Sequence, residues 1–137
     1  MLSSISFQGS SPSPPMEERE LATSGVLTSL NFPERYFNGL HIIQKIQVPE
    51  GNTIRIRFTD FNCEAKYDTV TITDKDGTRL GLFDGEHDDW RTKEIVSKTD
   101  TVEVLFHTDS SGTRTGWRLD WGKHKVVIII LCHSLNF

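Results

Sequence analysis

Three acidic residues on two separate loops are the feature of this sequence that most directly predicts chemistry. Glu64 and Asp68 lie in the stretch 58–72 (FTDFNCEAKYDTVTI), and Asp109 lies in the stretch 106–112 (FHTDSSG). If a folded sheet brings the two loops together, their carboxylates would form an oxygen cage for a hard cation such as Ca²⁺. A bound cation would also relieve the repulsion between three clustered carboxylates. The alternative is that these residues are solvated loop acids, or that Asp68 caps its own turn.

The elements that must position these loops show an apolar period of two. The segment 53–58 (TIRIRF) is the clearest case, because aliphatic and aromatic side chains alternate with polar ones. Shorter apolar patterns are separated by turn residues, and they occur at 40–48, 70–72, 80–82, 102–106 and 117–121. No helical apolar period persists in the body of the chain. Short strands at this spacing predict an all-β fold of the sandwich or barrel type.

The totals exclude several classes of function. A chain of 137 residues suits one domain, and a net charge of −4 predicts no nucleic-acid partner. No segment reaches the roughly 18–20 apolar residues of a membrane span. The two cysteines, Cys63 and Cys132, make no disulfide framework and indicate no redox compartment. The sequence lacks the G-x-S-x-G, H-E-x-x-H, P-loop and zinc-ligand spacings, so we expect no enzyme and no catalytic residue.

The two ends of the chain differ in composition from the body. Residues 1–20 are rich in Ser and Pro and predict a disordered arm before a domain at 21–123. The start lacks a basic region followed by an apolar core, so it predicts no secretory signal; the chain is then either not secreted or a product of something longer. Residues 124–137 hold the continuous apolar run VVIIILC. This tail is interpreted as an added strand, an edge-pairing segment or sequence foreign to the domain.

Four motifs, in this order, resemble the CUB domain family. They are GVLTSLNFPERY (25–36), VPEGNTIRIRFTDFNCE (48–64), YDTVTI (67–72) and LFHTDSSGTRTGWRLDW (105–121). Together they cover nearly all of the predicted domain. The last motif, with its Asp-Ser-Ser-Gly and Gly-Trp, is most similar to the second CUB domain of the serine proteases associated with complement C1 and mannose-binding lectin.

The resemblance implies a fold, a metal and a kind of partner. The fold is a two-sheet antiparallel sandwich of jelly-roll type, acting as a non-catalytic extracellular interaction module. The implied Ca²⁺ ligands are Glu64, Asp68, Asp109 and a backbone carbonyl at Ser111, with Tyr36 hydrogen-bonded to an acidic ligand. A Lys or Arg of a partner protein would meet Glu64 and Asp109. Alternatives are a glycan or glycosaminoglycan binder, a purely structural domain of a larger protease or receptor, and an intracellular β-sandwich.

The sequence departs from the family in its cysteines and in one loop. The resemblance implies two disulfides, but Ile42, Ala65 and Asp84 stand at three of the four positions, and no cysteine precedes Gly25. Both members of each pair are missing, which predicts a coherent disulfide-free domain, and Cys63 is then interpreted as a buried free thiol.

The loop between Glu64 and Asp68 is shorter than the family's. We therefore keep Asp60 as an alternative metal ligand to Glu64. His107, close to Asp109 in sequence, is interpreted as a surface residue of a strand.

Overall fold

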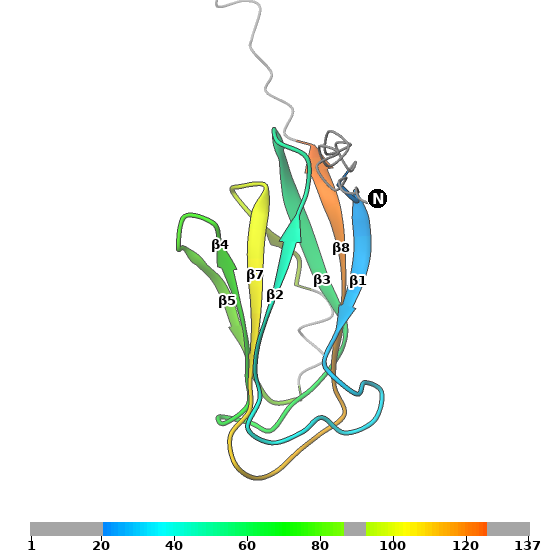
Figure 1. The fold of residues 1–137 in the computed structure, drawn as a ribbon, viewed down its shortest axis with the longest axis vertical. Coiled ribbons are helices and arrows are strands. Elements are labelled where there is room, and N and C mark those ends of the chain that lie inside the picture. The colour runs from blue at the N-terminus through cyan, green and yellow to red at the C-terminus, as the bar shows by residue number, and fades with distance from the viewer. Residues whose placement is uncertain (1–20, 87–92, 126–137) are drawn as a thin grey trace, which may run out of the picture.

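The computed structural model describes residues 21–86 and 93–125, which form two antiparallel four-stranded sheets packed face to face (Figure 1). The strands are β1 (Ser24–Thr28), β2 (His41–Gln47), β3 (Asn52–Asn62), β4 (Thr69–Asp74), β5 (Arg79–Phe83), β6 (Ile95–Val96), β7 (Thr101–His107) and β8 (Gly116–Lys125). One sheet has the order β1-β8-β3-β6 and the other β2-β7-β4-β5. The predicted all-β, two-sheet antiparallel sandwich of jelly-roll type is confirmed.

The chain crosses repeatedly between the sheets, and this collects its loops at two ends. Because neighbouring strands run antiparallel, the loops after β1, β3, β5 and β7 lie at one end, which we call the acidic end. The loops after β2, β4 and β6 lie at the opposite end. In Figure 1 the acidic end is at the bottom. The acidic stretches 64–68 and 108–115 are therefore brought to the same pole of the sandwich.

The boundaries predicted for the domain differ slightly from the strands observed. Strand β8 continues to Lys125, so the predicted boundary at 123 falls inside a strand. The predicted arm at 1–20 and residues 126–137 of the apolar tail lie outside the described residues. Within residues 21–86 and 93–125, no helix combines the length and apolar character that crossing a membrane requires.

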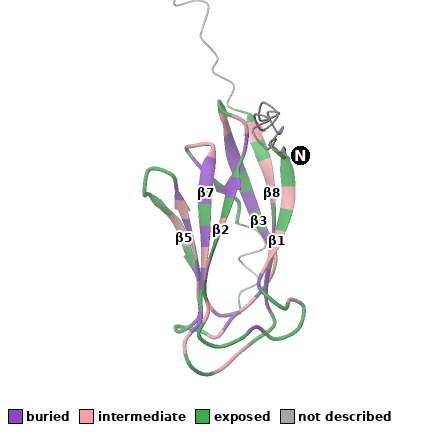
Figure 2. Cartoon of the chain, viewed as in Figure 1, coloured by how far each residue is buried: buried purple, intermediate pink, exposed green. Residues whose placement is uncertain are grey.

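The core forms where the apolar side chains of the two sheets face each other. Ile54, Ile56 and Phe58 are buried as their alternation predicts, and Trp117 from β8 is fully buried against the Phe58 ring. Figure 2 shows the corresponding alternation of buried and exposed residues along β7. A strand with one buried face reads as a period-two pattern, and this is why the sequence predicted these strands well.

The apolar pattern at 80–82 places Leu80 and Leu82 on one face, but the structure separates them. Leu80 is partly buried against the core, whereas Leu82 is 48% exposed and Phe83 is the buried residue at 5%. The register of β4 and β5 shifts between Ile72 and Thr73, which leaves Leu80 as an extra residue in β5. Such a bulge moves every following side chain to the other face. Phe83 consequently packs against Phe58, with ring centroids 5.0 Å apart.

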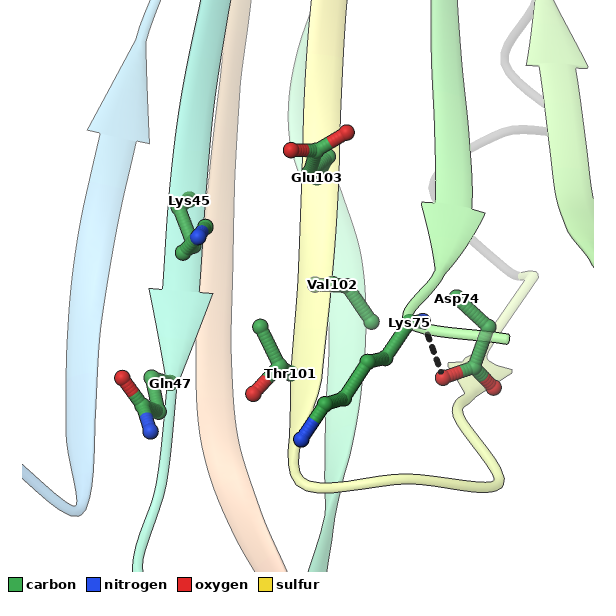
Figure 3. Close-up of a pocket in the computed structure, with 7 residues that line it drawn as sticks. All are labelled: Lys45, Gln47, Asp74, Lys75, Thr101, Val102 and Glu103. Atoms are coloured by element: carbon green, nitrogen blue, oxygen red, sulfur yellow. Dashed lines mark hydrogen bonds between the residues drawn. The ribbon is translucent and has the colours of Figure 1, made fainter. Parts of the chain in front are cut away.

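Asp74 organises the end of the sandwich opposite the acidic end. Its buried carboxylate accepts hydrogen bonds from the main-chain N–H groups of Lys75 (2.9 Å) and Lys98 (2.6 Å) and from the Thr99 hydroxyl. Figure 3 shows the bond to Lys75 beside the pocket that Asp74 lines with residues of β2 and β7. The side chain thereby joins the β4–β5 turn to the β6–β7 loop.

Replacing Asp74 by alanine is expected to lower the free energy of unfolding by about 3 kcal/mol, because two partly buried main-chain donors and the Thr99 hydroxyl would lose their acceptor. Urea unfolding measures the change. The matched control is Asp76→Ala in the same turn, where an exposed carboxylate accepts one main-chain bond, from Thr78. It should cost about 1 kcal/mol or less. Equal losses for both variants would contradict the role given to Asp74.

Candidate metal centre

The acidic end brings the three predicted carboxylates together. Glu64, Asp68 and Asp109 each offer an oxygen, and these oxygens all lie within 4.8 Å of one another. Asp60, the predicted alternative to Glu64, does not belong to this group. It lies inside β3 opposite Arg118, where its carboxylate accepts a hydrogen bond from Thr59.

The loop from residue 64 to 68 keeps Glu64 at the site because it closes on itself as a turn. The Asp68 N–H donates to the Glu64 carbonyl at 3.1 Å, and Lys66 takes a left-handed conformation with φ of 74°. The Lys66 N–H donates to the Asp84 carboxylate at 2.6 Å. The resemblance implied cysteines at the positions of Ala65 and Asp84, and this hydrogen bond joins the two segments that hold those positions. The shortness of the loop, which motivated Asp60, is thus accommodated by backbone conformation.

Asp68 is the buried centre of the group. It is fully buried, its Oδ2 accepts a 2.6 Å hydrogen bond from the Tyr36 hydroxyl, and its Oδ1 accepts a 2.9 Å bond from the Asp109 N–H. The Tyr36 oxygen accepts in turn from the Glu64 N–H at 2.9 Å. Burial, followed by the hydrogen bond to Asp68, raises the pKa of Tyr36, so the phenol remains a donor. Tyr36 thereby links two of the acidic residues, in the place that the resemblance implied.

The β1–β2 loop is fastened to the β7–β8 loop around the site. Gly39 N–H donates to the Asp109 carbonyl at 2.7 Å, and Tyr36 N–H donates to the Arg114 carbonyl at 3.0 Å. The buried Thr108 hydroxyl donates to the Phe37 carbonyl at 2.9 Å. Sequence reasoning missed Thr108, because a threonine beside an acidic residue carries no recognisable signal. These bonds hold Asp109 in place without using its side chain.

Glu64 carries the clearest sign that the site fits a cation. Among the residues that the structure describes, its Oε1 atom is shielded from solvent and has no hydrogen-bond partner. Desolvation, and then the negative charges of Asp109 and Asp68, raise the pKa of Glu64. Its carboxylate lies against Gly112, where a Cβ atom would come within 2.6 Å of the Glu64 Cδ. A lone oxygen among carboxylates, in a space that only glycine leaves open, fits a hard cation with oxygen ligands.

Ser111 lies at the edge of this group. Its N–H donates to Asp109 Oδ1 at 3.3 Å, which makes a tight turn after β7. The predicted use of its carbonyl as a metal ligand stays a prediction.

The raised pKa of Glu64 predicts the pH dependence of stability without metal. The folded state binds a proton at Glu64 more tightly than the unfolded state, so protonation of Glu64 stabilises the folded state. This stabilisation is fully present below the ordinary glutamate pKa. It is lost as pH rises through the raised value. In EDTA, the free energy of unfolding is therefore expected to contain a contribution that falls with rising pH above about 4.3. Saturating Ca²⁺ should reverse this contribution, since the metal competes with the proton.

Urea unfolding across this pH range, with EDTA and with Ca²⁺, tests the expectation. Glu64→Gln should remove the Glu64 contribution in both conditions. Glu103→Gln, at an exposed position of β7, is the control and should leave it in place. A Glu64→Gln variant whose pH profile matches that of the unmodified chain would contradict the assignment.

Two further side chains near the site match their predicted roles. Cys63 is a buried free thiol, as predicted, and desolvation raises its pKa, so it is not a reactive thiolate. Its N–H donates to the Gly85 carbonyl, which ties the end of β3 to the segment after β5. His107 is exposed on β7, as predicted.

Comparison with known proteins shows which family this chain is similar to. The family model described as CUB domain matches residues 17–121. Human mannan-binding lectin serine protease 1 is 34% identical over 106 residues, covering 72% of this chain and 14% of that protein. Mouse complement C1r-B subcomponent is 31% identical over 105 residues, with the same two coverages.

Among solved structures, the MASP-1 CUB2 domain bound to Ca²⁺ aligns with a TM-score of 0.67 and 27% identity. The alignment covers 74% of this chain and 94% of that domain. The chain spans only 14% of the length of each of the two curated relatives named above.

Proposed function

The chain belongs to the CUB domain family, and on that premise we propose that it is a non-catalytic, extracellular protein-interaction module whose binding loops are ordered by one Ca²⁺. The observation that carries the proposal is the convergence of Glu64, Asp68 and Asp109 within 4.8 Å, with the shielded Glu64 oxygen among them. The likeness to a CUB2 domain whose structure holds Ca²⁺ supports the choice of ion. When bound, the ion would supply positive charge to the three carboxylates and hold the loops after β3 and β7 together.

The proposed partner is another protein that offers a Lys or Arg side chain. Three carboxylates carry one more negative charge than Ca²⁺ neutralises, and Glu64 and Asp109 are only half-buried, so both remain accessible. Phe37 (52% exposed) and Tyr67 (59% exposed) belong to the same loop end and offer aromatic contact area. Since the charge attraction acts near the surface, binding should weaken as salt concentration rises.

The proposal for the whole protein is a larger secreted protease or receptor that contains this module. Its support is the names of the relatives, which include a serine protease of which the chain spans 14%. The glycosaminoglycan alternative receives less support, because several arginines on the outer face of the β1-β8-β3-β6 sheet are paired with acids. These pairs are Arg55 and Arg57 with Glu94, and Arg118 with Asp120.

Ca²⁺ is expected to raise the free energy of unfolding by about 2.7 kcal/mol when its concentration is about 100 times the dissociation constant. The reason is that the ion binds the three carboxylates where the folded chain brings them together, and does not bind them in the unfolded chain, where they are far apart. Thermal unfolding with Ca²⁺ and with EDTA measures the shift. Asp109→Ala should abolish it, because that variant removes one ligand and leaves the main-chain bonds of residue 109 in place.

The matched control is Asp120→Ala, an exposed acidic residue on β8 away from the acidic end, which should keep the full Ca²⁺ shift. Identical melting curves in Ca²⁺ and in EDTA would overturn the metal centre and, with it, the proposed docking surface.

A further inference from the structure

A pair of histidines lies on the outer face of the β2-β7-β4-β5 sheet. His41 of β2 is directly opposite His107 of β7 in the register, and both side chains are exposed. The flanking hydrogen bond from Thr108 N–H to the Leu40 carbonyl, at 2.9 Å, marks His41 and His107 as a non-hydrogen-bonded pair. In such a pair the two Cα atoms are only about 4.5 Å apart, and the side chains lie closer than elsewhere in the ladder.

The two imidazole rings have the separation that a shared metal ion requires. Their centroids are 5.9 Å apart and their planes meet at 78°. With metal–nitrogen bonds of about 2.0–2.1 Å, two imidazoles on one ion place their centroids roughly 5–6 Å apart. Both side chains are exposed, so they can turn toward a shared ion without a change of backbone.

We propose that His41 and His107 form a binding site for a divalent transition-metal ion of the zinc type. Imidazole nitrogen suits zinc, copper and nickel, whereas Ca²⁺ prefers carboxylate and carbonyl oxygens. The histidine pair is therefore chemically distinct from the proposed Ca²⁺ site, although Asp109 of that site follows His107 by two residues. It goes beyond the proposed Ca²⁺-dependent function and does not depend on it.

The sheet holds the two ligands in place before any ion arrives. Strand β7 is paired on both sides, with β2 over seven residue pairs and with β4 on its other edge. The ordering cost of chelation is then limited to the side-chain torsions of His41 and His107. Thr69 is the next residue across the register from His107, so the remaining metal positions are left to a hydroxyl and to water. Two protein ligands with open positions make a site that takes an outside ligand, such as a side chain of a bound protein.

The competing explanation is that the rings are an edge-to-face aromatic pair that only stabilises the two strands. Phenylalanine keeps the ring and removes the nitrogen, so His41→Phe and His107→Phe separate packing from metal binding. In the experiment, Zn²⁺ is the only titrant and is added to the full chain in a calorimeter. Ca²⁺ is present at a saturating concentration, so that the cluster of Glu64, Asp68 and Asp109 is already occupied. Thermal unfolding with and without Zn²⁺ gives a second measurement. His124→Gln, on β8 of the other sheet, is the control.

Each single phenylalanine variant is expected to lower the Zn²⁺ affinity roughly tenfold or more and to remove the Zn²⁺-dependent rise in melting temperature. The double variant should lose no more than either single variant, because one imidazole without the other cannot chelate. His124→Gln should bind as the unmodified chain does. Zn²⁺ binding that survives in the double variant, or losses that add from one histidine to the next, would overturn the site. A failure of the Ca²⁺ experiment above would leave this outcome unaffected.

Discussion

Replacing Asp68 by alanine is expected to lower the free energy of unfolding by about 3–5 kcal/mol and to abolish the response to Ca²⁺. The carboxylate is fully buried and accepts from both the Tyr36 hydroxyl and the Asp109 N–H. Its removal would leave the buried Tyr36 hydroxyl and the partly buried Asp109 N–H without an acceptor. Urea unfolding in Ca²⁺ and in EDTA gives the two values, and the loss should be present in both conditions.

Two variants separate the structural role of Asp68 from its role as a ligand. Tyr36→Phe removes one donor to Asp68 and the acceptor of the Glu64 N–H, so it should cost about 1–2 kcal/mol and weaken Ca²⁺ binding without abolishing it. Asp109→Ala should lose the Ca²⁺ response at a smaller cost in EDTA, because its carboxylate is only half-buried. An Asp68→Ala variant within 1 kcal/mol of the unmodified chain would show that the buried network is not the centre of this loop end.

Gly112→Ala is expected to lower Ca²⁺ affinity about a hundredfold without altering a ligand. The Cβ atom would come within 2.6 Å of the Glu64 Cδ and even nearer to its Oε2, so the carboxylate must leave its place. The backbone also has a φ of +82° at this residue, which adds about 1–2 kcal/mol for any residue with a Cβ. Calorimetric titration of Ca²⁺ measures the affinity, and urea unfolding in EDTA measures the backbone cost separately.

Gly51→Ala is the matched control for this substitution. Gly51 has a φ of +89°, and a Cβ atom there would meet nothing within 4 Å. It lies in the β2–β3 turn at the opposite end of the sandwich. The variant should show a similar backbone cost and unchanged Ca²⁺ affinity. If both variants bind Ca²⁺ as the unmodified chain does, Glu64 is not a ligand in the position that the structure gives it.

The Ca²⁺ centre and the histidine pair depend on different features of the fold. The three clustered carboxylates depend on loops that are hydrogen-bonded to each other. The stability of these loops and the metal affinity of the cluster are therefore coupled through Tyr36 and Asp68. The histidine pair depends only on the register of β2 and β7. Substitutions in one site are therefore expected to leave the other intact, which lets the two proposals fail or succeed separately.

Apart from the two-residue strand β6 and the buried face of β5, the sequence by itself determined most of the strands, the side chains of β3 that enter the core, and the identity of the acidic residues. This was possible because the period-two alternation is local, so Ile54, Ile56 and Phe58 could be placed in the core from their spacing alone. The motifs at 67–72 and 105–121 likewise carried Asp68 and Asp109 as neighbours of strand ends.

Only the tertiary structure decided which acidic residues meet and what surrounds them. The left-handed turn at Lys66 keeps Glu64 at the site and leaves Asp60 in a strand, and a bulge exchanges the faces of Leu82 and Phe83. The packing of the Glu64 carboxylate against Gly112 and the pairing of His41 with His107 likewise join residues far apart in sequence. Such contacts depend on strand register and loop closure, which are set by the packing of whole sheets, so no local pattern records them.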